Sequence, residues 1–192
     1  MLTLDLANQL KAKFGDLISE PTEFRGEITV KLADAEQIAE VCGFAKAKLG
    51  FEYLVDISSV DNYGEDPRWT VVYDLRSLSN NAELRIKTDV SEEKSELPTV
   101  LGVWATANWH EREIYDMMGI RFCGHPVLRR ILMWEGYPYF PLRKDFPLAG
   151  KPTNVPDVAF TAISPMEGGP FVTLPSSGDA VSREPRVRTP EA

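Results

Sequence analysis

The 192-residue chain is long enough for one ordinary domain with an extension, and its hydrophobic content of 43% is enough to form a buried core. We expect a soluble chain, because no segment approaches the roughly 20 consecutive apolar residues of a membrane-spanning helix and the amino end has no basic segment followed by a long apolar one. The net charge of −8 argues against a general nucleic-acid binder, since phosphate binding depends on clustered Lys and Arg.

The first part of the chain predicts two helices around one strand. Apolar residues recur at helical spacing over residues 3–20, and Ile28, Val30 and Leu32 alternate as in a strand. Asp34, followed three residues later by Gln37, resembles a capping box for a second helix that ends at Gly50. The apolar face expected for this helix consists of Ile38, Val41, Cys42, Ala45 and Leu49.

Three strands follow, over residues 51–57, 69–75 and 84–88, and the turn-forming residues between them favour antiparallel pairing. Residues 99–118 predict a helical region with a break near 106–108, which Gly119 ends. The fold class is therefore α+β: a small, largely antiparallel or mixed sheet packed by helices. We assign residues 1–146 to this domain.

Residues 147–192 predict an extended Pro-rich tail that wraps a partner. Ten of the 14 prolines lie between Pro138 and Pro190, which forbids a continuous helix or a central strand. A disordered end is the alternative that composition alone leaves open. Net charge is unevenly distributed along the chain. Residues 1–111 carry 20 acidic and 11 basic side chains (−9), whereas residues 112–192 carry 9 acidic and 10 basic ones (+1).

The residues that could carry chemistry cluster between 110 and 130. A zinc-protease helix is excluded because Ile114 stands where the second histidine is required. A composite metal site from His110, Cys123 and His125 stays open as a minor alternative. Glu113 and Asp116 are three residues apart, as in an acid–base pair, but an ordinary charged helix face in which Arg112 pairs with Asp116 is the stronger interpretation.

Cofactor binding is not expected in this chain. Its two cysteines, Cys42 and Cys123, cannot supply the four thiolates of an ordinary iron–sulfur cluster, and the simplest interpretation is two reduced thiols. No Gly-rich phosphate loop is present. The arginines near Arg129 and Arg143 suit contacts with carboxylates, either on a partner or within the chain at Glu111, Glu113 and Asp116.

A specific pattern runs through the same stretch: Glu111-Arg112-Glu113, two residues, Asp116-Met117-Met118, six residues, His125, three residues, Arg129, one residue and Ile131-Leu132. It closely resembles the signature of the 30 kDa subunit family of respiratory complex I. Further matches are Gly124-His125-Pro126 and the segment from Pro141 to Pro147. Weaker likeness extends the resemblance over most of residues 30–150, whereas residues 133–140 depart from the acidic-aromatic loop expected there.

The resemblance implies a non-catalytic scaffold in the peripheral arm of a proton-translocating NADH:quinone oxidoreductase, on the cytoplasmic side of the cell membrane. It implies docking on the 49 kDa-type subunit (the D subunit), near the B and I subunits, which with other partners hold FMN and iron–sulfur clusters. The expected interface residues are Glu111, Arg112, Glu113, Asp116, His125, Pro126, Arg129, Arg130, Pro141, Leu142, Arg143, Lys144, Asp145 and Phe146. The alternatives are the equivalent subunit of a membrane-bound hydrogenase and a free-standing metal-dependent hydrolase.

Overall fold

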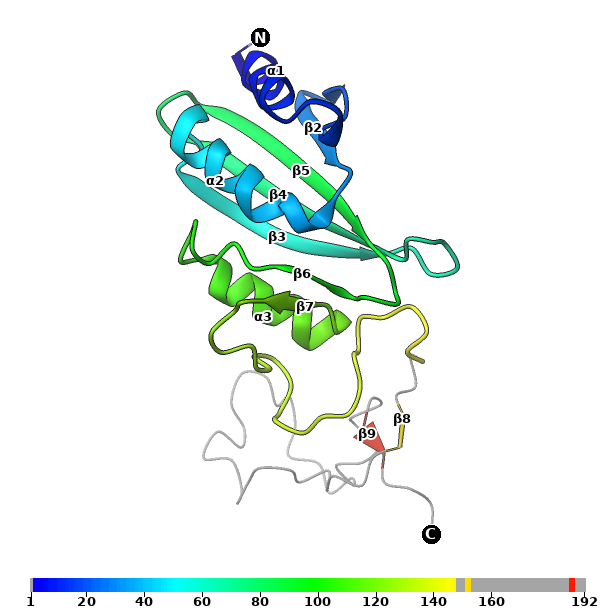
Figure 1. Ribbon diagram of the computed structural model, residues 1–192. Coiled ribbons are helices and arrows are strands. Elements are labelled where there is room, and N and C mark those ends of the chain that lie inside the picture. Colours follow the sequence, from blue (N-terminus) through cyan, green and yellow to red (C-terminus); the bar gives the residue numbers. More distant parts are fainter. Residues whose placement is uncertain (1, 148–150, 153–186, 189–192) are drawn as a thin grey trace. The chain divides into compact units, whose positions relative to one another are not determined.

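A computed structural model describes residues 2–147, 151–152 and 187–188 of the chain (Figure 1). The chain divides into two compact units, residues 1–143 and residues 144–192. The first unit holds a five-stranded sheet, three helices and a two-stranded sheet. In the second unit, β8 (Lys151–Pro152) pairs in parallel with β9 (Val187–Arg188). The predicted wrapping tail lies almost wholly outside the described residues.

The main sheet has the strand order β1-β2-β5-β4-β3. Its strands are β1 (Thr22–Phe24), β2 (Glu27–Leu32), β3 (Tyr53–Asp61), β4 (Trp69–Ser77) and β5 (Ala82–Val90). β1–β2, β3–β4 and β4–β5 are antiparallel, as predicted for the last two, whereas β2 and β5 pair in parallel. The expectation of a mixed α+β sheet is confirmed.

The core lies on one face of this sheet. Side chains alternate along β4 and β5, so that Trp69, Tyr73, Leu84 and Ile86 are buried while their sequence neighbours on the other face are more exposed. That other face carries ion pairs such as Arg85 with both Asp74 and Glu27, and Lys31 with Asp89. One apolar and one charged face explains the period-two pattern of these strands.

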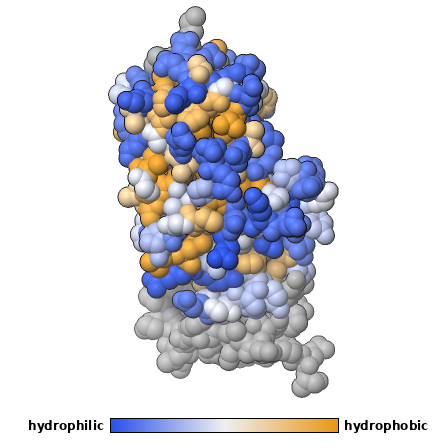
Figure 2. Space-filling model, in the orientation of Figure 1, coloured by the Kyte–Doolittle hydropathy of each residue, from blue (hydrophilic) through white to orange (hydrophobic). Residues whose placement is uncertain are grey.

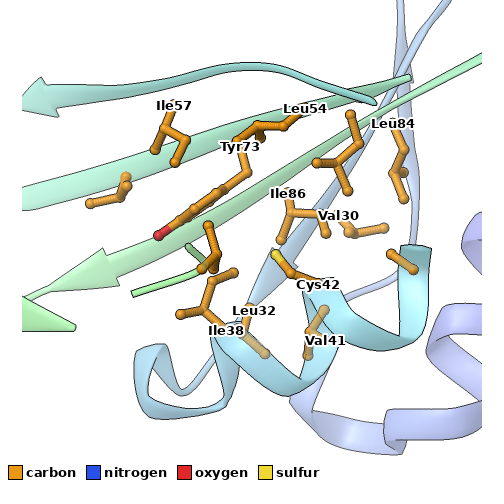
Figure 3. Packing of buried hydrophobic residues seen from close by; sticks show 14 of the residues in the cluster. Val30, Leu32, Ile38, Val41, Cys42, Leu54, Ile57, Tyr73, Leu84 and Ile86 are labelled. Carbon is orange, nitrogen blue, oxygen red and sulfur yellow. The ribbon is translucent and has the colours of Figure 1, made fainter. Parts of the chain in front are cut away.

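Helix α2 (Ile38–Leu49) covers the apolar face, and all five residues predicted for its buried face are buried. Figure 3 shows the ring of Tyr73 between the sheet and α2, with Cys42 facing Val30 and Ile86. Gly50 ends the helix in a left-handed conformation, as predicted. Asp34, however, caps a 3₁₀ turn (Ala35–Gln37) that precedes α2, where its side chain accepts a hydrogen bond from the Glu36 N–H.

The first helix is shorter than predicted. α1 spans Leu2–Phe14, and a 3₁₀ turn follows over Gly15–Leu17. Gly15 has a positive φ of 57°, a conformation that cannot continue a right-handed helix. Ile18 then forms a β-bridge with Leu32, so the end of the expected helix lies against the sheet instead.

The second half of the unit is built around helix α3 (Ala107–Met118), which begins where the sequence predicted a break. Residues 99–106 form turns rather than helix. β6 (Glu96–Pro98) precedes these turns and β7 (Arg121–Cys123) follows α3. The two strands pair in parallel, and α3 packs against β3 and β7 (Figure 1). Within the described part of the chain, no helix is long and apolar enough to cross a membrane.

Candidate functional site

The predicted site residues gather on α3 and on the irregular segment that follows it. Gly119 ends the helix at φ 79°, ψ 18°, as predicted, and its N–H donates to the Tyr115 carbonyl. The chain then turns back, so that residues 130–143 contact the carboxyl-terminal end of α3 at several backbone and side-chain atoms. Helix α3 and this segment are the parts that family resemblance singled out.

Asp116 holds this segment in place. Its side chain is fully buried, and Oδ1 lies 2.6 Å from Nη1 of Arg130. Oδ2 accepts the backbone N–H groups of Ile131, Leu132 and Met133 at 2.7–3.0 Å. Burial alone would raise the pKa of Asp116, but these hydrogen bonds outweigh it and lower the pKa below its usual value. The residue is therefore a charged structural anchor.

The expected pairing of Arg112 with Asp116 is wrong. Arg112 instead donates from Nε to the carbonyl of Arg129 and from Nη2 to the carbonyl of Arg130, both at 3.1 Å. Its guanidinium also stacks over the Trp109 ring at 5.5 Å. The buried Asp116 carboxylate contacts three backbone N–H groups and Arg130 instead. Helical spacing alone therefore did not predict the partner of Asp116.

Glu111 is the second buried carboxylate of α3. Its Oε2 accepts from the Thr99 hydroxyl at 2.5 Å and its Oε1 from the Val100 N–H at 2.7 Å, which fastens the turn before the helix to the helix itself. Burial raises the pKa of Glu111 to about 7, although both hydrogen bonds oppose the increase. The pattern of charged residues did not predict this contact, because Thr99 and Val100 carry no signal of it.

Two buried groups from the core lie within electrostatic reach of Glu111. Burial raises the pKa of the Tyr73 hydroxyl and of the Cys42 thiol, and the charge of Glu111 contributes to both increases. The Tyr73 hydroxyl has no hydrogen-bond partner among the described residues. Cys42 and Cys123 are both free thiols, the first buried and the second exposed.

Glu113 and Asp116 do not share one environment. Glu113 is exposed, whereas Asp116 is buried with both of its oxygens occupied. The histidines are also separate, since His110 Nδ1 lies 3.0 Å from Asp56 Oδ1 while His125 Nδ1 accepts the Val127 N–H. No group of three or more metal-ligating side chains lies together within the described ranges, so His110, Cys123 and His125 are not brought together as a site.

The later arginines stabilise the returning segment. Arg130 also donates to the carbonyls of Asp116 and Tyr139. Arg143 donates from Nε to the Met118 carbonyl at 2.6 Å and stacks over Phe140 at 4.5 Å. Of the predicted interface residues, Arg130 and Arg143 thus make contacts within the chain, as Glu111 and Asp116 do.

The remaining predicted interface residues differ in exposure. Glu113, Pro126, Arg129 and Leu142 are exposed, whereas Arg112, His125 and Pro141 are half-buried. Lys144 and Asp145 are exposed and Phe146 is half-buried in the second unit. The predicted interface left out the exposed apolar residues Val127 and Leu132, although Leu132 belongs to the signature pattern and Val127 lies between two of its residues, His125 and Arg129. Figure 2 shows apolar areas between polar side chains on one face of the molecule.

Comparisons with known proteins identify the family. The family model for the respiratory-chain NADH dehydrogenase 30 Kd subunit matches residues 32–152, which include all of α3 and the segment after it. The C subunit of NADH-quinone oxidoreductase from Geotalea uraniireducens is 49% identical over 142 residues, covering 74% of this chain and 86% of the relative. The C 2 subunit of the same enzyme from Rhizobium etli is 51% identical over 140 residues, covering 72% and 74%.

Two solved structures share the fold. A trypsin-resistant fragment of Nqo5 has a TM-score of 0.58 at 33% identity, covering 67% of this chain and all of the fragment. An archaeal membrane-bound sulfane sulfur reductase contains a chain with a TM-score of 0.64 at 21% identity, covering 75% and 85%, a likeness of fold alone. With the family model matching well over half of its length, the chain belongs to the 30 kDa subunit family of respiratory-chain NADH dehydrogenase.

Proposed function

We propose that this chain is a non-catalytic scaffold subunit in the peripheral arm of a proton-translocating NADH:quinone oxidoreductase. In that assembly, electrons pass from NADH through FMN and iron–sulfur clusters to quinone. The cofactors are held by partner subunits, and this chain positions its neighbours. Its partners are the 49 kDa-type D subunit and the B and I subunits, at the cytoplasmic side of the cell membrane.

One observation carries the proposal: the buried Asp116 side chain holds the segment after α3 in place, while that segment exposes apolar side chains to solvent. Asp116 binds three consecutive N–H groups of this segment. Leu132 and Leu142 nevertheless remain 62% and 55% exposed. A preorganised surface with exposed apolar residues binds a partner at lower entropic cost than a mobile one. The proposed interface is held in shape by residues that make contacts within the chain: Glu111, Asp116, Arg130 and Arg143.

The same contacts support a structural rather than catalytic role for the family's charged motif. Asp116 and Glu111 accept hydrogen bonds inside the chain, and Arg112 donates to backbone carbonyls. A general acid or base must reach a substrate proton at hydrogen-bond distance. Glu111, Arg112 and Asp116 therefore hold α3 to its flanking segments, as expected of a scaffold.

The test is to purify the chain by an affinity tag from its native membranes in mild detergent, with an untagged strain as the control. We expect the 49 kDa-type subunit and the flavin- and cluster-binding subunits to co-purify, with NADH:quinone reductase activity. Recovery of a nickel-binding large subunit would instead favour the hydrogenase alternative, since this fold also occurs in another respiratory membrane complex. Recovery of the chain alone would contradict the proposal.

A further inference from the structure

A groove of about 500 Å³ runs beside the first half of α3 and reaches Arg129, the residue before the anchored Arg130. Leu101, Pro126 and Val127 supply apolar lining, and Arg112 and Arg129 supply charge. None of the described residues that line the groove is a carboxylate. In a chain with a net charge of −8, this is a local concentration of positive charge on an apolar surface.

Arg112 is held in a fixed orientation at this groove. Two of its N–H groups donate to the carbonyls of Arg129 and Arg130, and the Trp109 ring lies 5.5 Å from its guanidinium carbon. A guanidinium has five N–H donors, so others remain for a ligand. Because the side chain is already ordered, binding an anion there loses little rotamer entropy.

Arg129 is exposed, and its side chain makes no hydrogen bond or ion pair with any residue that the structure describes. The neighbouring Arg130 and Arg143 are occupied by Asp116 and by backbone carbonyls. Arg129 is therefore placed to form a two-pronged ion pair with an incoming carboxylate, the geometry that guanidinium groups favour.

Apolar side chains adjoin the two arginines. Val127 in the groove is 54% exposed, and Trp109, which stacks with Arg112, is 57% exposed. Trp and Arg are the residue types that most often dominate binding energy at protein interfaces. An occupant must therefore supply both an apolar side chain and a negative charge.

We infer that this groove binds an acidic segment of a partner subunit, with a carboxylate on Arg129 and Arg112 and an aliphatic side chain against Val127. The inference rests on the proposed scaffold function and names the chemistry of the partner. Charge complementarity favours a peptide over a nucleic acid, since two arginines in an acidic chain are too few to neutralise a phosphate backbone. It also disfavours a second copy of the whole acidic chain through long-range repulsion.

The test uses the intact complex in native membranes, with a photo-crosslinking amino acid at Val127. We expect a crosslink to a partner peptide that contains Asp or Glu within a few residues of the attachment point. The control position is Leu78, which is 68% exposed in the turn between β4 and β5 and should not crosslink to that peptide.

Charge variants make the result specific. Arg129→Glu should lower the yield of the Val127 crosslink about tenfold, and Arg129→Lys should lower it less, because Lys keeps the charge but loses the two-pronged geometry. Arg25→Glu makes the same charge change at the exposed turn between β1 and β2 and should leave the yield unchanged.

The outcomes separate the two proposals. In an assembled, active complex, Val127 could instead crosslink to a peptide without acidic residues, to lipid, to nucleic acid or to a second copy of the chain. Any of these results would overturn the groove assignment and leave the scaffold function standing. So would an unchanged crosslink in Arg129→Glu, or none at all from Val127. A chain that is absent from every membrane complex would overturn both.

Discussion

Oδ1 of Asp116 lies 2.6 Å from Nη1 of Arg130, in an ion pair whose side chains are 0% and 12% exposed. The two residues are 14 positions apart in the sequence, and they join the last turn of α3 to the segment that follows β7. The second oxygen of the same carboxylate accepts three backbone N–H groups. One side chain therefore determines the path of residues 130–133.

Asp116→Asn removes the charge with little change in shape. We expect a loss of about 3 kcal/mol in the free energy of unfolding, because breaking a buried pair leaves Arg130 without its counter-charge. Urea unfolding at pH 7, followed by tryptophan fluorescence, measures it. Glu113→Gln, on the exposed side of the same helix, is the control and should change stability by less than about 0.5 kcal/mol. Similar losses in both variants would contradict the anchoring role.

Gly119→Ala tests the close packing at the end of α3. A Cβ atom there would lie 2.5 Å from Arg143 Nη2 and 2.8 Å from the Phe140 ring, and the residue has a positive φ of 79°. We expect about 2–4 kcal/mol of destabilisation from the backbone strain and the overpacking together. Thermal unfolding monitored by circular dichroism measures the effect.

Gly43→Ala is the matched control, since Gly43 lies within α2 and an added Cβ would meet no atom within 4 Å. It should stabilise the chain by about 0.5–1 kcal/mol through helix propensity. The prediction for Gly119 would be wrong if its alanine variant unfolded at or above the wild-type temperature.

Arg68→Ala should be strongly destabilising. Nε and Nη2 of Arg68 bind both oxygens of Asp61 at 2.9 and 3.0 Å, and the two side chains are only 5% and 2% exposed. We expect a loss of about 3–5 kcal/mol, because Asp61 would remain buried and charged. Arg76→Ala breaks the exposed pair with Glu83 and should cost less than about 1 kcal/mol in the same urea titration. Equal losses would argue against a special role for burial.

Local signals predicted much of the fold. The buried face of α2 follows directly from the spacing of Ile38, Val41 and Cys42, and the left-handed glycines end α2 and α3 as the sequence indicated. β6 and β7 were missed because three residues are too few to show an alternating pattern. The parallel pairing of β2 with β5 was missed because it joins segments with a helix and two strands between them.

The site was predicted in its residues but less in their contacts. The motif placed Glu111, Arg112 and Asp116 on one helix, yet sequence spacing favoured Arg112 as the partner of Asp116. The observed partner, Arg130, depends on the turn that residues 119–129 take after α3. Burial of Glu111 depends on the Thr99–Val100 turn, which folds against the helix from the other side. Such long-range contacts leave no periodic signal in one sequence.

Glu111 should make stability depend on pH between about 4.5 and 7. Its pKa rises from 4.5 to about 7 on folding, so the folded chain holds the proton more tightly than the unfolded chain does. This contribution is fully present below the unfolded pKa and is lost as pH rises through the folded value. The shift corresponds to roughly 3 kcal/mol. Urea unfolding at half-unit steps from pH 5 to 8 measures the slope.

Glu111→Gln isolates this effect. The glutamine carbonyl can still accept the Val100 N–H and its amide can donate to Thr99, so the turn stays in place without a titrating group. His125, whose pKa burial lowers, contributes the opposite slope, but it is present in both proteins and cancels in their difference. We expect the variant to gain stability relative to the wild type as pH rises from 5 to 7. A difference that stays constant across this range would show that Glu111 is ionised throughout.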